Sequence, residues 1–272
     1  MGALRKHLGR SQPFEIKYIK IGNEDFVATS SYSYRWPAFY NALSRRYPNI
    51  TFIATTTTSI PTPPAVDDHD YPSSQFFIDN FRRYEKIPRP KPKVLIGEFA
   101  TREAGSSDSL FYPTMRGAIA ESVYRIGFER NSYIIIGVVK STSYLAQKMF
   151  GANLGNIVLN STATNSTMSH ESVQEGGEGD GKLGNLYFIA TKHTNSNTLI
   201  IKLASVDAND TLVNIQIQDS ITTSEGIIYI LTGGPGVDPS TLSNTIDNPS
   251  AVSIITKLIW AVADKFSIII PS

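Results

Sequence analysis

The feature that most constrains this 272-residue sequence is a regular alternation of strand-like and helix-like segments in its first half. Apolar runs typical of strands lie at 15–22, 49–56, 93–100 and 132–140. Segments with apolar residues at helical spacing lie at 34–47, 73–86 and 115–130. Strand and helix in repeated succession predict parallel βα units, and therefore an α/β fold for this part of the chain.

The second half has a different pattern. From about residue 151 the helical periodicity disappears, and short strand-like runs follow at 184–192, 197–207, 211–219 and 225–233. Such short strands with polar turns between them are typical of a β-sandwich. We therefore expect an α/β domain over residues 1–145 and a β-sandwich over residues 146–272.

Composition indicates a globular chain and excludes several kinds of partner. The sequence is 41% hydrophobic, carries a net charge of +1 and contains no cysteine. The charge balance provides no general attraction to nucleic acid or to a membrane surface, and no apolar run approaches the roughly 20 residues that cross a bilayer. The amino-terminal segment lacks the apolar core of a signal peptide. The oligomeric state is not readable from the sequence.

Glycosylation sequons are present in both halves of the chain. The N-x-S/T pattern occurs at Asn49, Asn160, Asn165 and Asn209. Sequons predict surface positions in a secreted protein, although they also arise by chance. We expect these four asparagines to be acceptors if the protein is exported.

Two apolar runs end in the same way, with a glycine followed by a glutamate. Residues 19–25 read IKIGNED and residues 94–100 read VLIGEFA. In a parallel α/β fold, catalytic groups lie at the carboxyl ends of strands, and glycine lets a ligand approach the backbone closely. We therefore expect Glu24 and Glu98 to face one pocket.

A pair of carboxylates across a pocket suits the hydrolysis of a glycosidic bond. One carboxyl group must be protonated to donate to the leaving oxygen, and the other must be ionised to attack the sugar. Asn23, beside the first glutamate, is placed to hydrogen-bond a sugar hydroxyl. The alternative is that either glutamate is a helix cap or a surface charge.

The segment VDDHDYPSS, residues 66–74, is a further candidate strand end. We expect His69 and Tyr71 to line the pocket and Asp68 to orient its neighbours. A metal site is the alternative, but successive residues of an extended segment point to opposite sides, so few of them can meet at one ion. No G-x-S-x-G motif is present, so a serine triad has no support.

Taken together, these segments resemble the fungal and plant α-L-arabinofuranosidases of glycoside hydrolase family 51. The resemblance covers most of the chain and is carried by residues 13–26, 32–56, 66–100, 118–132 and 143–160. It implies a (β/α)8 barrel, here represented by about strands four to eight, followed by a β-sandwich. It also implies a retaining glycosidase that releases terminal α-L-arabinofuranosyl groups from arabinoxylan or arabinan.

The resemblance assigns roles to individual residues. It implies that Glu24 is the acid/base and Glu98 the nucleophile, and that Asn23 contacts the sugar's 2-hydroxyl. His69 and Tyr71 fall where the family has pocket-lining residues. The family implies secretion, a plant cell-wall polysaccharide as partner, and no metal or organic cofactor.

The resemblance also leaves parts of the family pattern unmatched. The chain begins shortly before the expected fourth barrel strand, and residues 129–145 suggest an internal deletion. An incomplete barrel has exposed sheet edges and a weaker pocket, so we expect activity to be impaired. The alternatives are a non-catalytic carbohydrate-binding or interaction remnant, and another barrel glycosidase such as a β-glycanase. The FERNS and QKMF segments favour the arabinofuranosidase.

Overall fold

The chain forms two compact units, each assembled from segments that are distant in the sequence. One unit comprises residues 1–69, 88–97 and 133–139, and the other comprises residues 70–87, 98–132 and 140–272. The computed structural model describes residues 2–87, 92–102, 114–138, 143–164, 181–207, 209–218, 225–233, 237–239, 242, 244, 247–262 and 264–271. The predicted boundary between residues 145 and 146 stays a prediction.

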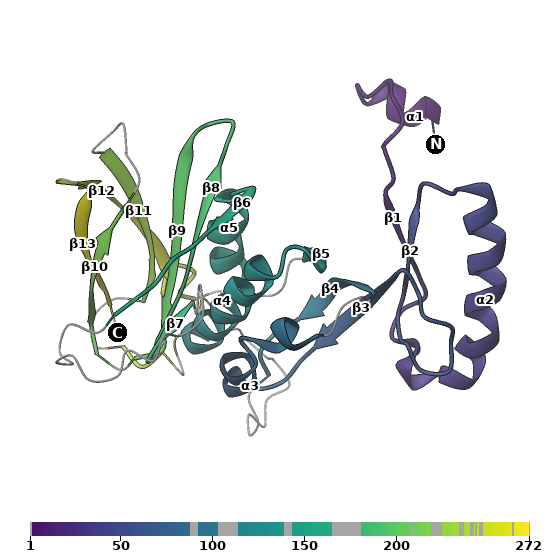
Figure 1. Cartoon of the computed structure of the whole chain (residues 1–272), viewed down its shortest axis with the longest axis horizontal. Helices are drawn as coiled ribbons and strands as arrows, with labels where there is room; N and C mark the ends of the chain where they lie inside the picture. The colour runs from purple at the N-terminus through teal and green to yellow at the C-terminus, as the bar shows by residue number, and fades with distance from the viewer. Residues whose placement is uncertain are drawn as a thin grey trace. The chain divides into compact units, whose positions relative to one another are not determined.

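A five-stranded sheet forms the centre of the first unit (Figure 1). Its strands, in spatial order, are β1 (Tyr18–Ile21), β2 (Thr51–Ala54), β3 (Ala65–Asp70), β4 (Lys93–Phe99) and β5 (Ile135–Val138). β1 pairs with β2, β2 with β3, and β4 with β5, all in parallel. The prediction of parallel βα units is therefore confirmed, and the sheet is consistent with part of a (β/α) barrel.

Helix α2 (Thr29–Arg46) packs on β2 through a stripe of aromatic side chains. Tyr32, Trp36 and Tyr40 recur at four-residue spacing, which places them on one helix face. The Trp36 and Tyr40 rings stack with centroids 5.3 Å apart, and Tyr40 meets the edge of Phe52 at 6.1 Å. This aromatic core holds the ends of β1 and β2 against the helix. The unit also contains α1 (Gly2–His7) and the short helix η1 (Asp25–Val27).

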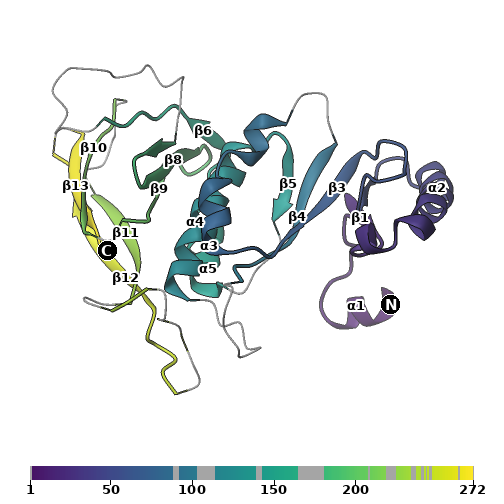
Figure 2. The same ribbon diagram turned by 90° about the horizontal axis from the view of Figure 1, so that it is seen from below.

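Three α-helices and a 3-10 helix lie in the second unit: α3 (Ser74–Asp79), η2 (Arg83–Lys86), α4 (Met115–Arg130) and α5 (Tyr144–Ala152). The helix predicted at 73–86 is therefore divided into two. Thr114 caps α4, where its hydroxyl accepts a hydrogen bond from the Gly117 amide at 3.1 Å. Figure 2 shows α4 and α5 beside β8, and α4 buries most of its length.

The remaining strands of this unit are antiparallel. They are β6 (Ile157–Leu159), β7 (Lys182–Leu183), β8 (Leu186–His193), β9 (Thr198–Ser205), β10 (Thr211–Gln216), β11 (Glu225–Thr232), β12 (Ser253–Trp260) and β13 (Lys265–Ile270). β8 pairs with β6, β7 and β9, while β10 pairs with β13 and β11 with β12. The four strands expected from the sequence match β8 to β11, and the sandwich that we expected them to build stays a prediction.

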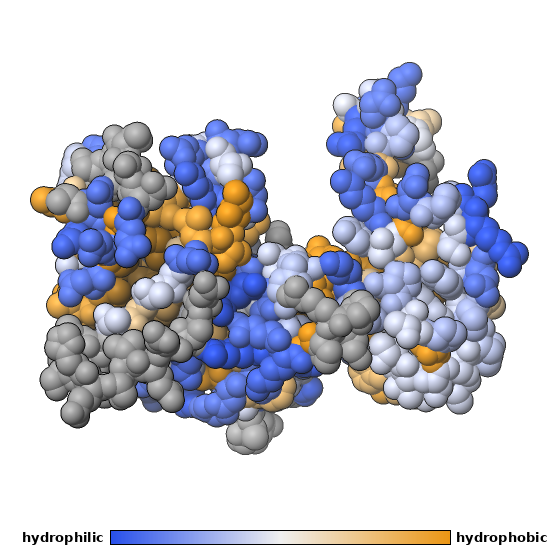
Figure 3. Space-filling view, viewed as in Figure 1, coloured by the Kyte–Doolittle hydropathy of each residue, from blue (hydrophilic) through white to orange (hydrophobic). Residues whose placement is uncertain are grey.

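An apolar cavity of about 840 Å³ lies among these antiparallel strands. Its walls include Ile201 and Leu203 of β9, Ile228 and Ile230 of β11, and Ile268 of β13. Figure 3 shows apolar surface gathered over this part of the second unit. The strands thus present an apolar face that their own side chains do not fill.

None of the helices in the described part of the chain is both long and apolar enough to cross a membrane.

An ion pair buried in the second unit joins α4 to β9. The Lys202 ammonium donates to the Glu129 carboxylate and to the Phe150 carbonyl oxygen. Burial raises the pKa of the Glu129 carboxyl group and lowers the pKa of the Lys202 ammonium, because desolvation disfavours both charges. The attraction between the two groups opposes both shifts, so each depends on its partner.

Loss of Lys202 should therefore lower the stability of the folded protein. We expect Lys202→Met to lower the free energy of unfolding by about 3 kcal/mol, because it leaves the Glu129 carboxylate buried without its counter-ion. The double variant Lys202→Met/Glu129→Gln should lose less than the sum of the two single variants. Urea unfolding followed by circular dichroism measures these differences, with the exposed Lys257→Met as control.

The same variant should be sensitive to pH. In the folded protein the pKa of Glu129 lies above that of the unfolded chain, so the native state binds the proton more tightly and stability falls as pH rises through that window. Without Lys202 the pKa rises further. The cost of Lys202→Met should be smaller at about pH 5 than at about pH 8. A cost that does not change with pH contradicts this account.

Candidate active site

The turn after β1 requires a glycine, because the Asp25 carboxylate occupies the space that a side chain at position 22 would need. Gly22 has a φ of +100°, and a Cβ atom there would lie 2.0 Å from Oδ2 of Asp25. Glycine alone adopts this backbone conformation at little cost, and it alone leaves room for the carboxylate. The glycine that ends β1 is therefore a packing requirement of the turn.

Asp25 holds the turn in shape. Its side chain is 7% exposed and accepts hydrogen bonds from the Asn23 amide at 3.1 Å and the Thr55 hydroxyl at 2.8 Å. Arg35 of α2 donates to the other carboxylate oxygen at 2.6 Å. These contacts join the end of β1, the end of β2 and α2 around one buried charge.

The Tyr32 hydroxyl connects the same two strand ends. It donates to the Ile21 carbonyl oxygen at 2.8 Å and accepts from the Thr55 amide at 3.1 Å. Burial raises the pKa of Tyr32, although the hydrogen bonds from Thr55 oppose this, so the phenol stays neutral and keeps the proton that it donates. The polar groups at the ends of both strands are thereby satisfied.

Glu24 projects from this turn with a strained backbone. Its φ of 50° and ψ of 33° lie in the left-handed region, which residues other than glycine and asparagine occupy infrequently. The side chain is 43% exposed, and Oε1 lies 3.3 Å from Nδ1 of His69 on β3. Strain of this kind is retained where the surrounding structure enforces it, commonly at functional sites.

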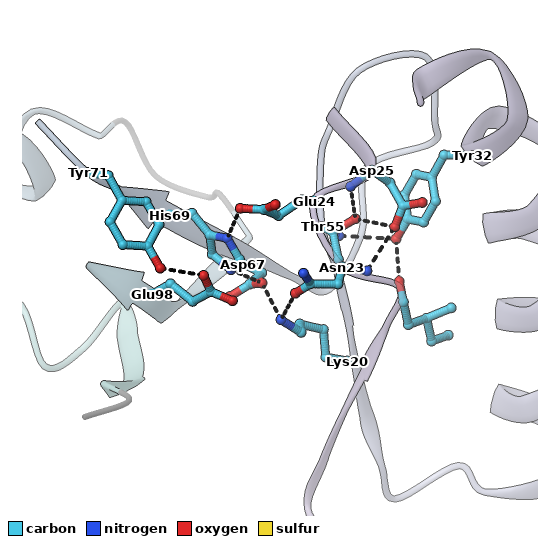
Figure 4. A network of polar contacts seen from close by, with 11 residues as sticks. Lys20, Asn23, Glu24, Asp25, Tyr32, Thr55, Asp67, His69, Tyr71 and Glu98 are labelled. Atoms are coloured by element: carbon cyan, nitrogen blue, oxygen red, sulfur yellow. Dashed lines mark hydrogen bonds and ion pairs between the residues drawn. The ribbon is translucent and has the colours of Figure 1, made fainter. Parts of the chain in front are cut away.

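Beside Glu24 and His69 lies a partly buried ion pair between Lys20 and Asp67 (Figure 4). The Lys20 ammonium donates to Oδ2 of Asp67 at 2.9 Å and to Oδ1 of Asn23 at 2.7 Å. His69 Nε2 lies 2.8 Å from the same Asp67 oxygen. Asp67 and His69 are two residues apart on β3, so they share one face of the strand.

The end of β4 repeats the arrangement of glycine and aspartate. A Cβ atom on Gly97 would lie 2.0 Å from Oδ1 of Asp67, so this glycine also gives its space to a buried carboxylate. The next residue is Glu98, and the Tyr71 hydroxyl donates to its Oε2 at 2.5 Å. The hydrogen bond holds the Glu98 carboxyl group in one orientation.

The last residues of β3 and β4, Asp70 and Phe99, are anchored inside the second unit. Oδ2 of Asp70 accepts from Arg83 at 2.6 Å and from the Tyr124 hydroxyl at 3.0 Å. Burial and the neighbouring Asp70 charge raise the pKa of Tyr124, so its hydroxyl remains a donor. Phe99 packs edge-on against Phe128 with centroids 5.5 Å apart, which fixes the residue after Glu98.

The structure brings together some of the residues that the sequence identified and adds others. Glu24 contacts His69, and Glu98 contacts Tyr71. Asp25 and Asp67 were not singled out, and Asp67 contacts His69. Spacing offered a signal for this contact, because only Asp67 lies two residues from His69 on the strand. The orienting role expected of Asp68 stays a prediction.

Three of the predicted glycosylation positions are exposed. Asn49 lies in the turn before β2, Asn160 follows β6, and Asn209 precedes β10. Asn165 lies outside the described residues. Exposure is required of an acceptor but does not test whether the sugar is attached.

The described residues of the first unit explain the contacts of His69 and Glu24 without an ion. His69 lies between the carboxylates of Asp67 and Glu24, and Lys20 supplies a positive charge to Asp67. A cation here would compete with the lysine and the imidazole for the same oxygens. The absence of a metal in the function stays a prediction.

Two of the parallel strands, β1 and β4, end in a glycine that is followed within two residues by a glutamate. In parallel α/β folds the carboxyl ends of the strands carry the catalytic groups, and carboxyl groups there serve acid–base and nucleophilic chemistry on sugars. The arrangement resembles that of α/β glycoside hydrolases.

Comparison with known proteins shows which glycoside hydrolases this chain is similar to. Residues 1–89 match the family described as the alpha-L-arabinofuranosidase 1 domain. The probable α-L-arabinofuranosidase A of Aspergillus terreus and the α-L-arabinofuranosidase A of Aspergillus niger are each 27% identical to the chain. Each alignment covers 93% of this chain and 42% of the relative. The chain is therefore related to the α-L-arabinofuranosidases of glycoside hydrolase family 51, which confirms the resemblance.

Solved structures of α-L-arabinofuranosidases are also similar to this chain. The arabinose-bound MgGH51 α-L-arabinofuranosidase matches with a TM-score of 0.79 and 29% identity, over 100% of this chain and 46% of that one. The arabinose complex of the α-L-arabinofuranosidase from Thermotoga maritima matches with a TM-score of 0.68 at 16% identity, which shows a shared fold. The chain spans less than half the length of the Aspergillus relatives.

The requirement for glycine after β1 can be tested by substitution. Gly22→Ala should lower the free energy of unfolding by about 3 kcal/mol, because it adds a clash with Asp25 to the strain of a positive φ. Gly9 is a matched control, since its φ is +90° and nothing lies within 4 Å of a Cβ atom there. Gly9→Ala should cost about 1 kcal/mol. Equal costs in urea unfolding would show that the Asp25 contact is unimportant.

Proposed function

We propose that this chain carries the catalytic residues of a retaining α-L-arabinofuranosidase. The substrate class is arabinoxylan or arabinan, from which the enzyme releases terminal α-L-arabinofuranosyl groups. One observation carries the proposal: each of the two glutamates follows a glycine at the carboxyl end of a strand of one sheet, in a chain related to family 51 enzymes. Since the chain spans less than half of those relatives, the tests below use this chain itself.

The two glutamates have different surroundings, which suit different roles. Glu24 lies beside an imidazole, with which it can exchange a proton, so we assign it as the acid/base. Glu98 accepts a hydrogen bond from the Tyr71 hydroxyl, which holds the carboxyl group in one orientation and suits a nucleophile. In the first step Glu98 attacks the anomeric carbon while Glu24 protonates the leaving oxygen, and in the second step Glu24 activates water.

The remaining predicted residues would bind the sugar. Asn23 is exposed beside Glu24 and is assigned to the 2-hydroxyl, while His69 and Tyr71 line the pocket. We further propose that the antiparallel strands of the second unit belong to a β-sandwich, that the protein is secreted, and that Asn49, Asn160, Asn165 and Asn209 are glycosylation sites. These assignments rest on the family relationship and, for three of the asparagines, on their exposure.

If Glu98 is the nucleophile and Glu24 the acid/base, the rate loss in each variant should depend differently on the leaving group of the substrate. Glu98→Ala should abolish turnover of every α-L-arabinofuranoside, because the nucleophile acts on all of them. Glu24→Ala should slow the release of poor leaving groups by about 10²–10⁴-fold. It should slow the first step with 2,4-dinitrophenyl α-L-arabinofuranoside much less, since that leaving group needs no proton. Steady-state and burst kinetics distinguish the two variants.

The control is Glu15→Ala, which removes an exposed carboxylate from the same unit. If the wild-type chain does not turn over 4-nitrophenyl α-L-arabinofuranoside faster than Glu98→Ala, this chain is not the proposed enzyme. Binding of arabinose without turnover would instead favour a non-catalytic carbohydrate-binding protein. Preferential cleavage of the corresponding β-xyloside would indicate a different glycosidase of the same fold.

The Tyr71 hydroxyl should support Glu98. Tyr71→Phe removes the hydrogen bond to Oε2, so we expect kcat to fall by about tenfold or more, in line with the strength of hydrogen bonds to charged groups. Tyr34→Phe, which changes an exposed tyrosine of α2, is the matched control. An unchanged kcat in Tyr71→Phe would remove this role from the tyrosine.

A further inference from the structure

Asp67 is the most deeply buried carboxylate beside the proposed site, and its burial has a cost. Its side chain is 1% exposed. Oδ2 contacts both Lys20 and His69, while Oδ1 accepts no hydrogen bond from any residue in the described part of the chain. A buried carboxylate oxygen without a donor is destabilising, and such groups in native proteins call for a functional explanation.

Two observations show that the chain is built around this carboxylate. Gly97 leaves the space that Oδ1 occupies, since a Cβ atom there would be 2.0 Å away. Lys20, on β1, reaches across the sheet to pair with Oδ2. Substitution of either residue would displace or unpair Asp67, so three strands contribute to its position.

We propose that Asp67 is a positioning residue of the site, and that it acts on Glu24 through His69. This inference rests on the proposed function and deepens it. The Asp67 oxygen lies 2.8 Å from Nε2 of His69, and this contact is an ion pair by distance without hydrogen-bond geometry. Because that oxygen is negative, its charge favours a proton on Nε2 over a lone pair. Asp67 therefore determines which ring nitrogen of His69 carries a proton.

The consequence for Glu24 follows from the other ring nitrogen. With Nε2 protonated, Nδ1 either donates to an ionised Glu24 or accepts the proton of a neutral Glu24, 3.3 Å away. In both states one proton lies between Nδ1 and Oε1. This shared proton is the one that Glu24 gives to the leaving oxygen in the first step, and a proton from water replaces it in the second, while His69 stays in place.

A second connection runs from Asp67 to Asn23 through Lys20. The ammonium donates to Oδ1 of Asn23 at 2.7 Å, which leaves the amide nitrogen directed away from the lysine, as Figure 4 shows. An amide group held in this way presents donors to a ligand rather than its carbonyl oxygen. Lys20 therefore makes Asn23 a hydrogen-bond donor to an acceptor atom such as a hydroxyl oxygen of the sugar.

The first test observes His69 without requiring turnover. In the full chain labelled with ¹⁵N-histidine, the ring of His69 is identified by its loss in His69→Gln. We expect Asp67→Asn to shift both ring ¹⁵N resonances of His69, because the charge that holds the Nε2 proton is removed. Glu15→Gln, the same loss of charge at an exposed carboxylate of the same unit, should leave them unchanged. Circular dichroism and thermal unfolding establish that each variant is folded.

The second test measures catalysis. Asp67→Asn should lower kcat for the 4-nitrophenyl arabinofuranoside by about a hundredfold, as displaced catalytic groups do. It should affect the 2,4-dinitrophenyl substrate much less, which repeats the pattern of Glu24→Ala in a weaker form. A purely structural role would slow both substrates equally. Glu15→Gln should behave as the wild type.

The contact between Lys20 and Asn23 can be tested separately. Lys20→Met should reduce the preference for the arabinofuranoside over its 2-deoxy analogue by about tenfold, because Asn23 is no longer held as a donor. If the preference is unchanged, the connection through Lys20 is wrong.

The outcomes separate this inference from the proposed function. If the wild-type chain is inactive but Asp67→Asn shifts the His69 resonances, the proposed function fails and the control of His69 by Asp67 stands. If the resonances are the same in folded Asp67→Asn and in the wild type, the inference is overturned whether or not the chain is active.

Discussion

At two strand ends a glycine leaves the space of a side chain to a buried aspartate carboxylate, and this packing determines the geometry of the site. At the end of β1, Gly22 makes room for Asp25, and at the end of β4, Gly97 makes room for Asp67. Each aspartate then gathers donors from neighbouring elements, which is the condition for burying a charge. Glu24 lies within the first of these turns and Glu98 directly follows Gly97, so the backbone positions of both glutamates depend on the two buried charges.

Each unit contains one of the proposed catalytic glutamates. The first unit contains Glu24, its strained turn and the contact with His69. The second unit contains Glu98, the Asp70 network and the aromatic packing of Phe99. In each unit, residues adjacent in sequence to the glutamate carry the packing.

The local pattern of apolar residues was sufficient to predict most strands and helices in the first half of the chain. Apolar runs at strand spacing correctly predicted β1, β2 and β4, and the helical periodicity of 115–130 matched α4 residue for residue. The helix predicted at 73–86 was interrupted because Asn80 ends α3 and the chain turns before η2. β12 and β13 were not predicted, since the paired strand that stabilises each of them is distant in the sequence.

The sequence by itself determined the repeated strand–glycine–glutamate pattern, the relationship to family 51, and the candidates Glu24, Glu98, Asn23, His69 and Tyr71. These features depend on residue type and short-range spacing, which a single sequence displays. Only the tertiary structure decided that Asp25 and Asp67 are buried beneath the glycines, and that Lys20 joins Asp67 to Asn23. Those contacts connect residues up to 47 positions apart, and a buried charge is recognised only once its partners are in place.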